Sequence, residues 1–282
     1  MNSKLFSSAL LVFTVPAHAA LIASWDQNES SGNLIDSTGG HPAAVPVGTN
    51  AYSQPGVPNG TYGSIVVAGA TGTSIGYGPS IVDSFFTSGS DNNNPVMNIP
   101  NTGSFTVMSW INPTAGDIAG RSYRPLSTGS AGGADRGWGV ALRLGNADGT
   151  NATIRFTSYG LADNDSDPFT AVIGSWVHIA ATYNNGAINY YLNGNLLTGG
   201  DTSVFGDEGV AARLTIGGRL GGNDADQVSG RLDGVRVYNE VLTAAQIQAA
   251  ALASVSAVPE PSSLALAAAA ATGLLRRRRK QR

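Results

Sequence analysis

Apolar and polar residues alternate with a period of two along residues 174–197. Successive side chains of a strand point to opposite sides, so the alternation predicts two strands that each have one apolar face. Asn184-Asn185-Gly186 and Asn193-Gly194 supply residues that tolerate the positive φ of tight turns, which predicts an antiparallel hairpin. Its apolar positions are Val177, Ile179, Ala181, Tyr183, Ile188, Tyr190 and Leu192. A lone hairpin is marginally stable, so other strands must cover this face.

Short apolar runs separated by Gly, Asn, Asp and Ser indicate further strands on both sides of the hairpin. They fall at 21–25, 64–67, 80–86, 105–111, 124–129, 137–145, 152–160 and 214–220. No helical periodicity separates them, which favours antiparallel sheets packed as a sandwich. Residues 45–103 are rich in Gly, Pro and Ser, and we interpret them as an insertion near the rim. A capping box at 243–246 predicts a short helix to about Ala253 that covers one end of the sandwich.

Several motifs together resemble the LamG-like jelly-roll domain of the concanavalin A-like lectin/glucanase superfamily. Residues 176–183, WVHIAATY, are followed by a turn and a strand that ends in Asn193-Gly194, as in that family. Similar segments precede it at 104–113, SFTVMSWINP, and follow it at 214–220 and 230–247. The resemblance covers roughly residues 21–253 and implies an all-β fold, an antiparallel jelly-roll sandwich with a short C-terminal helix.

The first 19 residues carry the pattern of a signal peptide. Lys4 precedes an apolar run, and Ala17-His18-Ala19 is the small-x-small pattern that signal peptidase cuts. We therefore expect residues 1–19 to be removed during export, with Ala17 and Ala19 at the cleavage site, and a folded domain over residues 20–254.

Residues 255–282 resemble the PEP-CTERM sorting signal. Pro259-Glu260-Pro261 comes first, then an Ala/Leu run over 264–275, which we expect to form a separate hydrophobic sorting helix, and then a basic end at 276–280. The resemblance implies cutting by an exosortase near Pro259, Glu260 and Pro261. It also implies a chain held transiently in the inner membrane of a Gram-negative-type bacterium through this helix alone, and then sorted to the cell surface or the outside.

The composition excludes several classes of protein. The chain has no cysteine, so disulfides and thiolate chemistry are absent. Removing Lys4, the six basic residues of the last seven positions and Glu260 leaves nine basic and 18 acidic residues. Such an acidic domain repels phosphate backbones, so we expect no nucleic-acid partner.

A structural calcium ion is the cofactor that the resemblance implies. The family's acidic first loop and its final L-D-x-V strand correspond here to Glu29, Asp36 and Asp233, and calcium prefers such oxygen ligands. Asp36 capping a turn and Asp233 ending a strand would explain the same residues without a metal. Asp163-Asn164-Asp165-Ser166-Asp167 lacks the Gly and Glu of an EF-hand loop, which leaves a weaker calcium site or a solvated acidic turn.

No catalytic constellation emerges from the sequence. Glucanases of this superfamily carry an E-x-D-x-x-E strand, and none of Glu29, Glu208, Glu240 and Glu260 has those neighbours. Residues 72–76 match G-x-S-x-G, but without a following helix this match is best explained by chance. We expect His178 to have a structural role on the outer side of its strand.

Three functions are compatible with these observations. The favoured one is a non-catalytic binding module for glycan or another surface component. The alternatives are a structural component of an extracellular matrix or exopolysaccharide layer and, more distantly, a glycan hydrolase.

Overall fold

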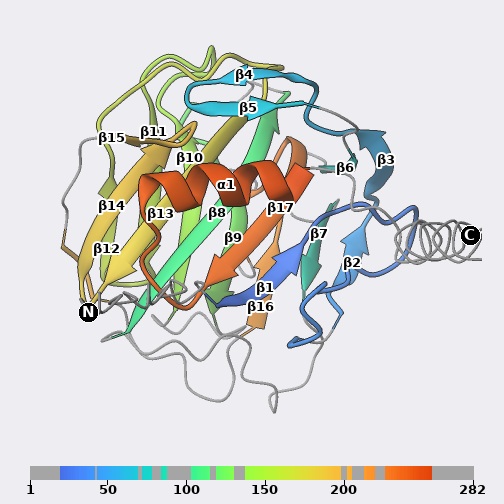
Figure 1. Cartoon of the computed structure of the whole chain (residues 1–282), viewed down its shortest axis with the longest axis horizontal. Coiled ribbons are helices and arrows are strands. Elements are labelled where there is room, and N and C mark those ends of the chain that lie inside the picture. Colours follow the sequence, from blue (N-terminus) through green and yellow to red (C-terminus); the bar gives the residue numbers. More distant parts are fainter. Residues whose placement is uncertain are drawn as a thin grey trace, which may run out of the picture.

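Two antiparallel sheets face each other in the computed structural model (Figure 1). The structure describes residues 20–41, 43–68, 72–77, 84–87, 103–114, 119–129, 137–197, 202–204, 213–219 and 226–255. The predicted signal peptide and sorting signal lie outside these residues. Within them, none of the helices is long and apolar enough to cross a membrane.

The larger sheet has eight strands and contains the predicted hairpin. Its order is β15-β14-β13-β8-β17-β6-β3, with β1 also paired to β17. The strands are β1 (Leu21–Trp25), β3 (Ala51–Pro55), β6 (Thr73–Tyr77), β8 (Ser104–Pro113), β13 (Val177–Asn184), β14 (Ala187–Leu192), β15 (Asn195–Leu197) and β17 (Gly230–Tyr238). Asn185 and Gly186 have φ of 45° and 98° at the β13–β14 turn, which confirms the predicted turn chemistry.

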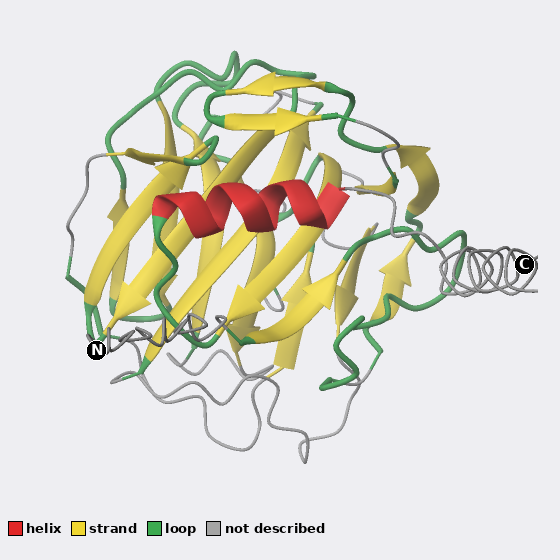
Figure 2. Ribbon diagram, in the orientation of Figure 1, coloured by secondary structure: helices red, strands yellow, loops and turns green. Residues whose placement is uncertain are grey.

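The smaller sheet has seven strands in the order β12-β11-β10-β9-β16-β7-β2. They are β2 (Val45–Gly48), β7 (Ser84–Thr87), β9 (Ser122–Gly129), β10 (Trp138–Leu144), β11 (Ala152–Ser158), β12 (Ala162–Asp165) and β16 (Arg213–Ile216). A separate hairpin pairs β4 (Gly60–Tyr62) with β5 (Ile65–Val67). Figure 2 shows the two layers of strands.

The core between the sheets is built around four aromatic rings. Phe105 and Tyr183 come from the larger sheet, and Trp138 and Phe156 come from the smaller one. The ring centroids of Phe105 lie 4.6 Å from Trp138 and 5.1 Å from Tyr183, so the rings join the two layers. The inward faces of β13 and β14 are buried here, as the alternation predicts.

The described parts of residues 45–103 do not form an insertion at the rim. β2 and β7 extend the smaller sheet, while β3 and β6 extend the larger one. Among the strands described in this stretch, only β4 and β5 lie apart from both sheets. The interpretation was wrong because these short strands lack a strong alternation of their own, and their pairing partners are distant in sequence. The G-x-S-x-G match falls on β6, where buried Ser74 donates to the Pro55 carbonyl at 2.9 Å instead of standing on a strand-to-helix turn.

The helix α1 (Ala244–Val255) lies across the outer face of the larger sheet and does not cover an end of the sandwich (Figure 1). Its start is the predicted capping box, because Gln246 N–H donates to Thr243 Oγ1 at 3.3 Å and Thr243 N–H donates to Gln246 Oε1 at 2.9 Å. Near its end, Trp110 donates its indole N–H to the Ala251 carbonyl at 3.0 Å. Arg236 donates to the carbonyls of Ala250 and Ala253. Of these three carbonyls, that of Ala253 is one of the last four of the helix, which have no partner within it.

His178 is buried beneath this helix layer, with its ring 5.1 Å from Trp110. Neither ring nitrogen has a hydrogen-bond partner among the described residues. Burial therefore favours the neutral imidazole and lowers its pKa to about 3. The outer side of β13 is thus a second core, where His178 has no access to a substrate.

We predict that His178 makes the fold sensitive to acid. In the unfolded chain His178 has a pKa of about 6.5 and is protonated below that pH. In the folded chain it stays neutral until the pH falls to about 3. Stability falls across this window by up to about 1.4 kcal/mol per pH unit from this group. Urea unfolding of His178→Leu and the parent chain between about pH 7 and about pH 4.5 should show a shallower loss in the variant. If the unfolding free energies of the variant and the parent chain depended equally on pH, a neutral buried imidazole at His178 would be contradicted.

Candidate functional site

The outer face of the smaller sheet carries polar side chains at every second position of β11. Ala152, Ile154 and Phe156 point into the core, so the alternate residues Thr153, Arg155 and Thr157 point outward. No helix of the described chain covers this face, whereas α1 covers the larger sheet. The smaller sheet is therefore the side on which to look for a binding site.

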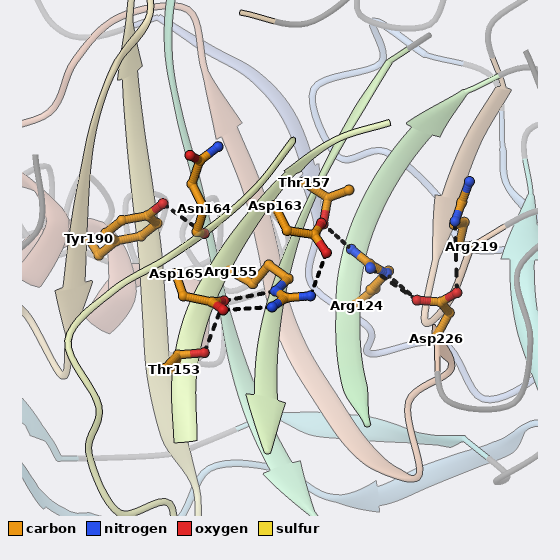
Figure 3. A network of polar contacts seen from close by, with 10 residues as sticks. All are labelled: Arg124, Thr153, Arg155, Thr157, Asp163, Asn164, Asp165, Tyr190, Arg219 and Asp226. Atoms are coloured by element: carbon orange, nitrogen blue, oxygen red, sulfur yellow. Dashed lines mark hydrogen bonds and ion pairs between the residues drawn. The ribbon is translucent and has the colours of Figure 1, made fainter. Parts of the chain in front are cut away.

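Arg155 is held by two aspartates of the neighbouring edge strand β12 (Figure 3). Its guanidinium donates to both oxygens of Asp165, at 2.8 and 2.6 Å, and to Asp163 at 2.5 Å. Burial alone would raise the pKa of Asp165, but hydrogen bonds from Arg155 and Thr153 outweigh it and hold the pKa below its usual range. The acidic run at 163–167 thus begins as an edge strand, which corrects the prediction of a solvated turn.

Asp226 links two further arginines on the same face (Figure 3). Arg124 lies 3.0 Å from Asp226 Oδ1 and donates to Thr157 Oγ1 at 3.1 Å. Arg219 is 3.9 Å from the other oxygen of Asp226, a looser contact. The Arg219 guanidinium lies over the ring of Tyr159, 4.1 Å from its centroid.

A pocket of about 310 Å³ opens beside this network at the turn between β11 and β12. Its side chains combine donors, an acceptor and an apolar group, from Thr157, Tyr159, Leu161, Asp163 and Arg219. Leu161 is 58% exposed, and Tyr159 is buried beneath Arg219. Such a mixture suits a ligand that has both hydroxyl groups and an apolar face.

A second pocket, of about 420 Å³, lies where β3, β6 and the start of β17 meet. Its principal polar groups are already engaged, because the Gln54 amide donates to the Tyr52 carbonyl and Arg231 donates to the Pro55 carbonyl. It therefore offers fewer groups to a ligand than the pocket at the β11–β12 turn.

The carboxylates proposed for calcium occupy three different environments. Asp36 accepts hydrogen bonds from the backbone N–H of Ser24, Thr38, Gly40 and His41 and from the Thr38 hydroxyl. Burial would raise its pKa, but these donors outweigh burial and lower it. Donors thus surround both oxygens, so Asp36 fits the role of a turn cap and does not fit that of a cation ligand.

Glu29 and Asp233 lie elsewhere. Glu29 Oε1 accepts from the Ile35 N–H at 2.9 Å in the loop after β1, while Asp233 is buried on the outer side of β17. Burial raises the pKa of Glu29 and places that of Asp233 well above its usual range. Among the described residues, no three His, Asp or Glu side chains are grouped so as to hold a metal ion. Glu29, Asp36 and Asp233 therefore do not fit a shared calcium site, and the calcium hypothesis needs an unfolding measurement to test it.

The arginine network was not anticipated from the sequence. The sequence pattern that could have revealed it is Thr153-x-Arg155-x-Thr157, which alternates with the apolar residues of the same strand. The pair Asp163-x-Asp165 follows this pattern along the chain. Asp226, Tyr159 and Arg219 follow strands and carry no periodic signal. Only the folded sheet brings them together.

The fold and this polar outer face define the class of protein, an all-β jelly-roll sandwich of the lectin type. Residues 86–248 match the family model of the concanavalin A-like lectin/glucanases superfamily, and the chain belongs to that family. Residues 257–280 match the PEP-CTERM protein-sorting motif, which implies export and processing by an exosortase in Gram-negative-type bacteria. A search of curated proteins finds no match to this chain.

Solved structures confirm the fold. One is domain 4 of AbnA, an extracellular arabinanase from Geobacillus stearothermophilus, in complex with arabinotriose: 22% identity, TM-score 0.54, 83% of this chain and 98% of that chain. Another is the binding domain of Paraclostridial Mosquitocidal Protein 1, with 15% identity and a TM-score of 0.52. The match covers 81% of this chain and 51% of that chain. A Trypanosoma rangeli sialidase matches at 15% identity and TM-score 0.52, with coverage of 81% and 32%. At these identities the likeness concerns the fold alone.

We predict that Asp233 is protonated in the folded protein. Above about pH 3.9 the Asp233 carboxyl group ionises in the unfolded chain, whereas its raised pKa keeps it protonated in the folded chain. The free energy of unfolding therefore decreases as the pH rises above this value. Asp233→Asn removes this titration, so its stability relative to the parent chain should increase with pH. Urea unfolding at several pH values measures the difference.

The parent chain and the variants Asp36→Asn and Asp233→Asn test calcium binding. We expect equal unfolding midpoints for the parent chain in calcium and in chelator, because Asp36 is saturated with donors and Asp233 is neutral. A rise of several degrees with calcium that Asp36→Asn or Asp233→Asn abolishes would restore the calcium hypothesis.

Proposed function

We propose that this protein is an exported, non-catalytic module that binds carbohydrate in the pocket at the β11–β12 turn. The observation that carries the proposal is the composition of that pocket, where Arg219 and Asp163 flank the exposed side chain of Leu161. Sugars present hydroxyl groups at their edges and C–H groups on their faces, so charged hydrogen-bonding groups beside an apolar side chain suit them. The arabinotriose-bound AbnA domain, which has the same fold, supports this class of ligand.

The ionisation of the acidic residues supports binding over hydrolysis. A glycoside hydrolase needs two carboxyl groups beside the substrate, one of which has a raised pKa and donates a proton. In this pocket Asp163 is paired with Arg155, and the adjacent Asp165 has a lowered pKa. Among the described residues, the carboxyl groups with raised pKa are Glu29 and Asp233, and neither lines the pocket.

The first prediction from this proposal concerns Leu161. The full chain, purified in detergent, should bind a subset of glycans on an array, and Leu161→Asn should weaken that binding. Loss of an apolar contact of about 1 kcal/mol corresponds to roughly a fivefold loss of affinity. The matched control is Val66→Asn, because Val66 is also 58% exposed but lies on β5, outside the pocket. Absence of binding to any glycan, or equal weakening by both variants, would contradict the proposal.

The second concerns sorting. If an exosortase processes the chain at Pro259-Glu260-Pro261, Glu260→Ala in a host that carries the enzyme should leave uncut protein in the membrane fraction. Glu240→Ala, which changes an accessible glutamate just before α1, is the control and should be processed normally. Cell fractionation with immunoblotting measures both, and normal release of Glu260→Ala would argue against recognition of this motif.

A further inference from the structure

Arg219 differs from the other two arginines of the network in how much of its guanidinium is available. The Arg155 side chain is 17% exposed and ion-paired with two aspartates, and that of Arg124 is 4% exposed and engaged by Asp226 and Thr157. The Arg219 side chain is 36% exposed, and the acidic group beside it, Asp226, is 3.9 Å away. Of the three, Arg219 therefore keeps N–H donors free for a ligand.

The Tyr159 ring supports the guanidinium group of Arg219. Arg219 and Arg124 both lie over the Tyr159 ring, with guanidinium carbons 4.1 and 5.7 Å from its centroid. Gly139 of β10 makes room for this ring, since a Cβ there would come within 2.5 Å of the Tyr159 hydroxyl. That hydroxyl is buried and has no hydrogen-bond partner among the described residues. A planar guanidinium stacked in this way is pre-organised for two parallel hydrogen bonds to a carboxylate.

The charges around the pocket indicate the kind of anion. Between residues 20 and 255 the chain has no lysine, and five of its nine arginines have described side chains on or beside the smaller sheet, Arg121, Arg124, Arg143, Arg155 and Arg219. The domain as a whole is acidic, so a negatively charged ligand is held only where arginines gather. Asp163 also faces the pocket, with 44% of its side chain exposed. It accepts hydrogen bonds from hydroxyl groups and repels a ligand that carries only negative charge.

We propose that the pocket is a subsite for an acidic polysaccharide, in which Arg219 binds the carboxylate of a uronic acid unit and Asp163 accepts from its hydroxyl groups. The inference rests on the proposed carbohydrate-binding function and names the ligand class of the same pocket. A uronate has both the carboxylate that Arg219 needs and the hydroxyl donors that Asp163 needs. At about 310 Å³ the pocket suits one charged unit of a chain.

Polygalacturonate and its fully methyl-esterified form test this, because they share one sugar backbone and differ in the free carboxylate. The full chain in detergent should bind polygalacturonate at least tenfold more tightly than the ester in calorimetry or biolayer interferometry. Arg219→Gln should remove this preference with a loss of about tenfold or more, the value of a hydrogen bond to a charged group. Arg219→Lys keeps the positive charge but loses the planar guanidinium. Its affinity for polygalacturonate should therefore lie between those of Arg219→Gln and the parent chain.

Arg231→Gln is the matched control, since Arg231 also lies over an aromatic ring, 5.3 Å from the centroid of Trp176, but belongs to the larger sheet. It should bind like the parent chain, and equal unfolding midpoints of all variants confirm that each is folded. Equal binding of both polymers, or a loss confined to Arg231→Gln, would overturn the uronate subsite. If array glycans other than uronates bind, the carbohydrate-binding proposal survives this failure, and if no glycan binds, both proposals fail.

Discussion

Burial of both faces of the larger sheet is the constraint on which the rest of the structure depends. Its inner face packs against the smaller sheet, and its outer face packs beneath α1 and the β4–β5 hairpin. Trp110, at the centre of the outer layer, contacts His178 and binds the carbonyl of Ala251. Apolar burial on this scale provides most of the driving force for folding. It also covers the centre of the larger sheet on both faces, so we place recognition on the other sheet and its rim.

The smaller sheet combines a buried face with a charged one, and ion pairs make the charged face rigid. Arg155 and Arg124 are fully engaged by aspartates on a neighbouring strand and in a loop. Partly buried pairs with this bidentate geometry hold side chains in one arrangement more effectively than exposed pairs do. Their value here is positional, because they hold the surroundings of Tyr159 and Arg219 in place before a ligand arrives. A binding site of this kind loses less side-chain entropy when it is occupied.

Local patterns account for what was predictable from the sequence. The β13–β14 hairpin follows from alternation and Asn-Gly turns, and the start of α1 follows from Thr243 and Gln246, because each depends on residues a few positions apart. The same reasoning missed the roles of β2, β3, β6 and β7, whose pairing joins residues far apart in the chain. It placed α1 on the wrong surface for the same reason. The candidate site escaped as well, since Arg124 and Asp226 meet across 102 positions.

The aspartates show why residue type alone does not define a site. N–H donors lower the pKa of Asp36 within a turn, the Arg155 fork lowers that of Asp165, and burial in a second core raises that of Asp233. A carboxylate binds a cation best when it is ionised and its lone pairs are free, and neither Asp36 nor Asp233 fits that description. Asp163 differs from all three, because it is paired with Arg155 and still faces an open pocket. The acidic residue that we assign to ligand binding is therefore Asp163, which lies in a polar segment that the sequence does not distinguish from a surface turn.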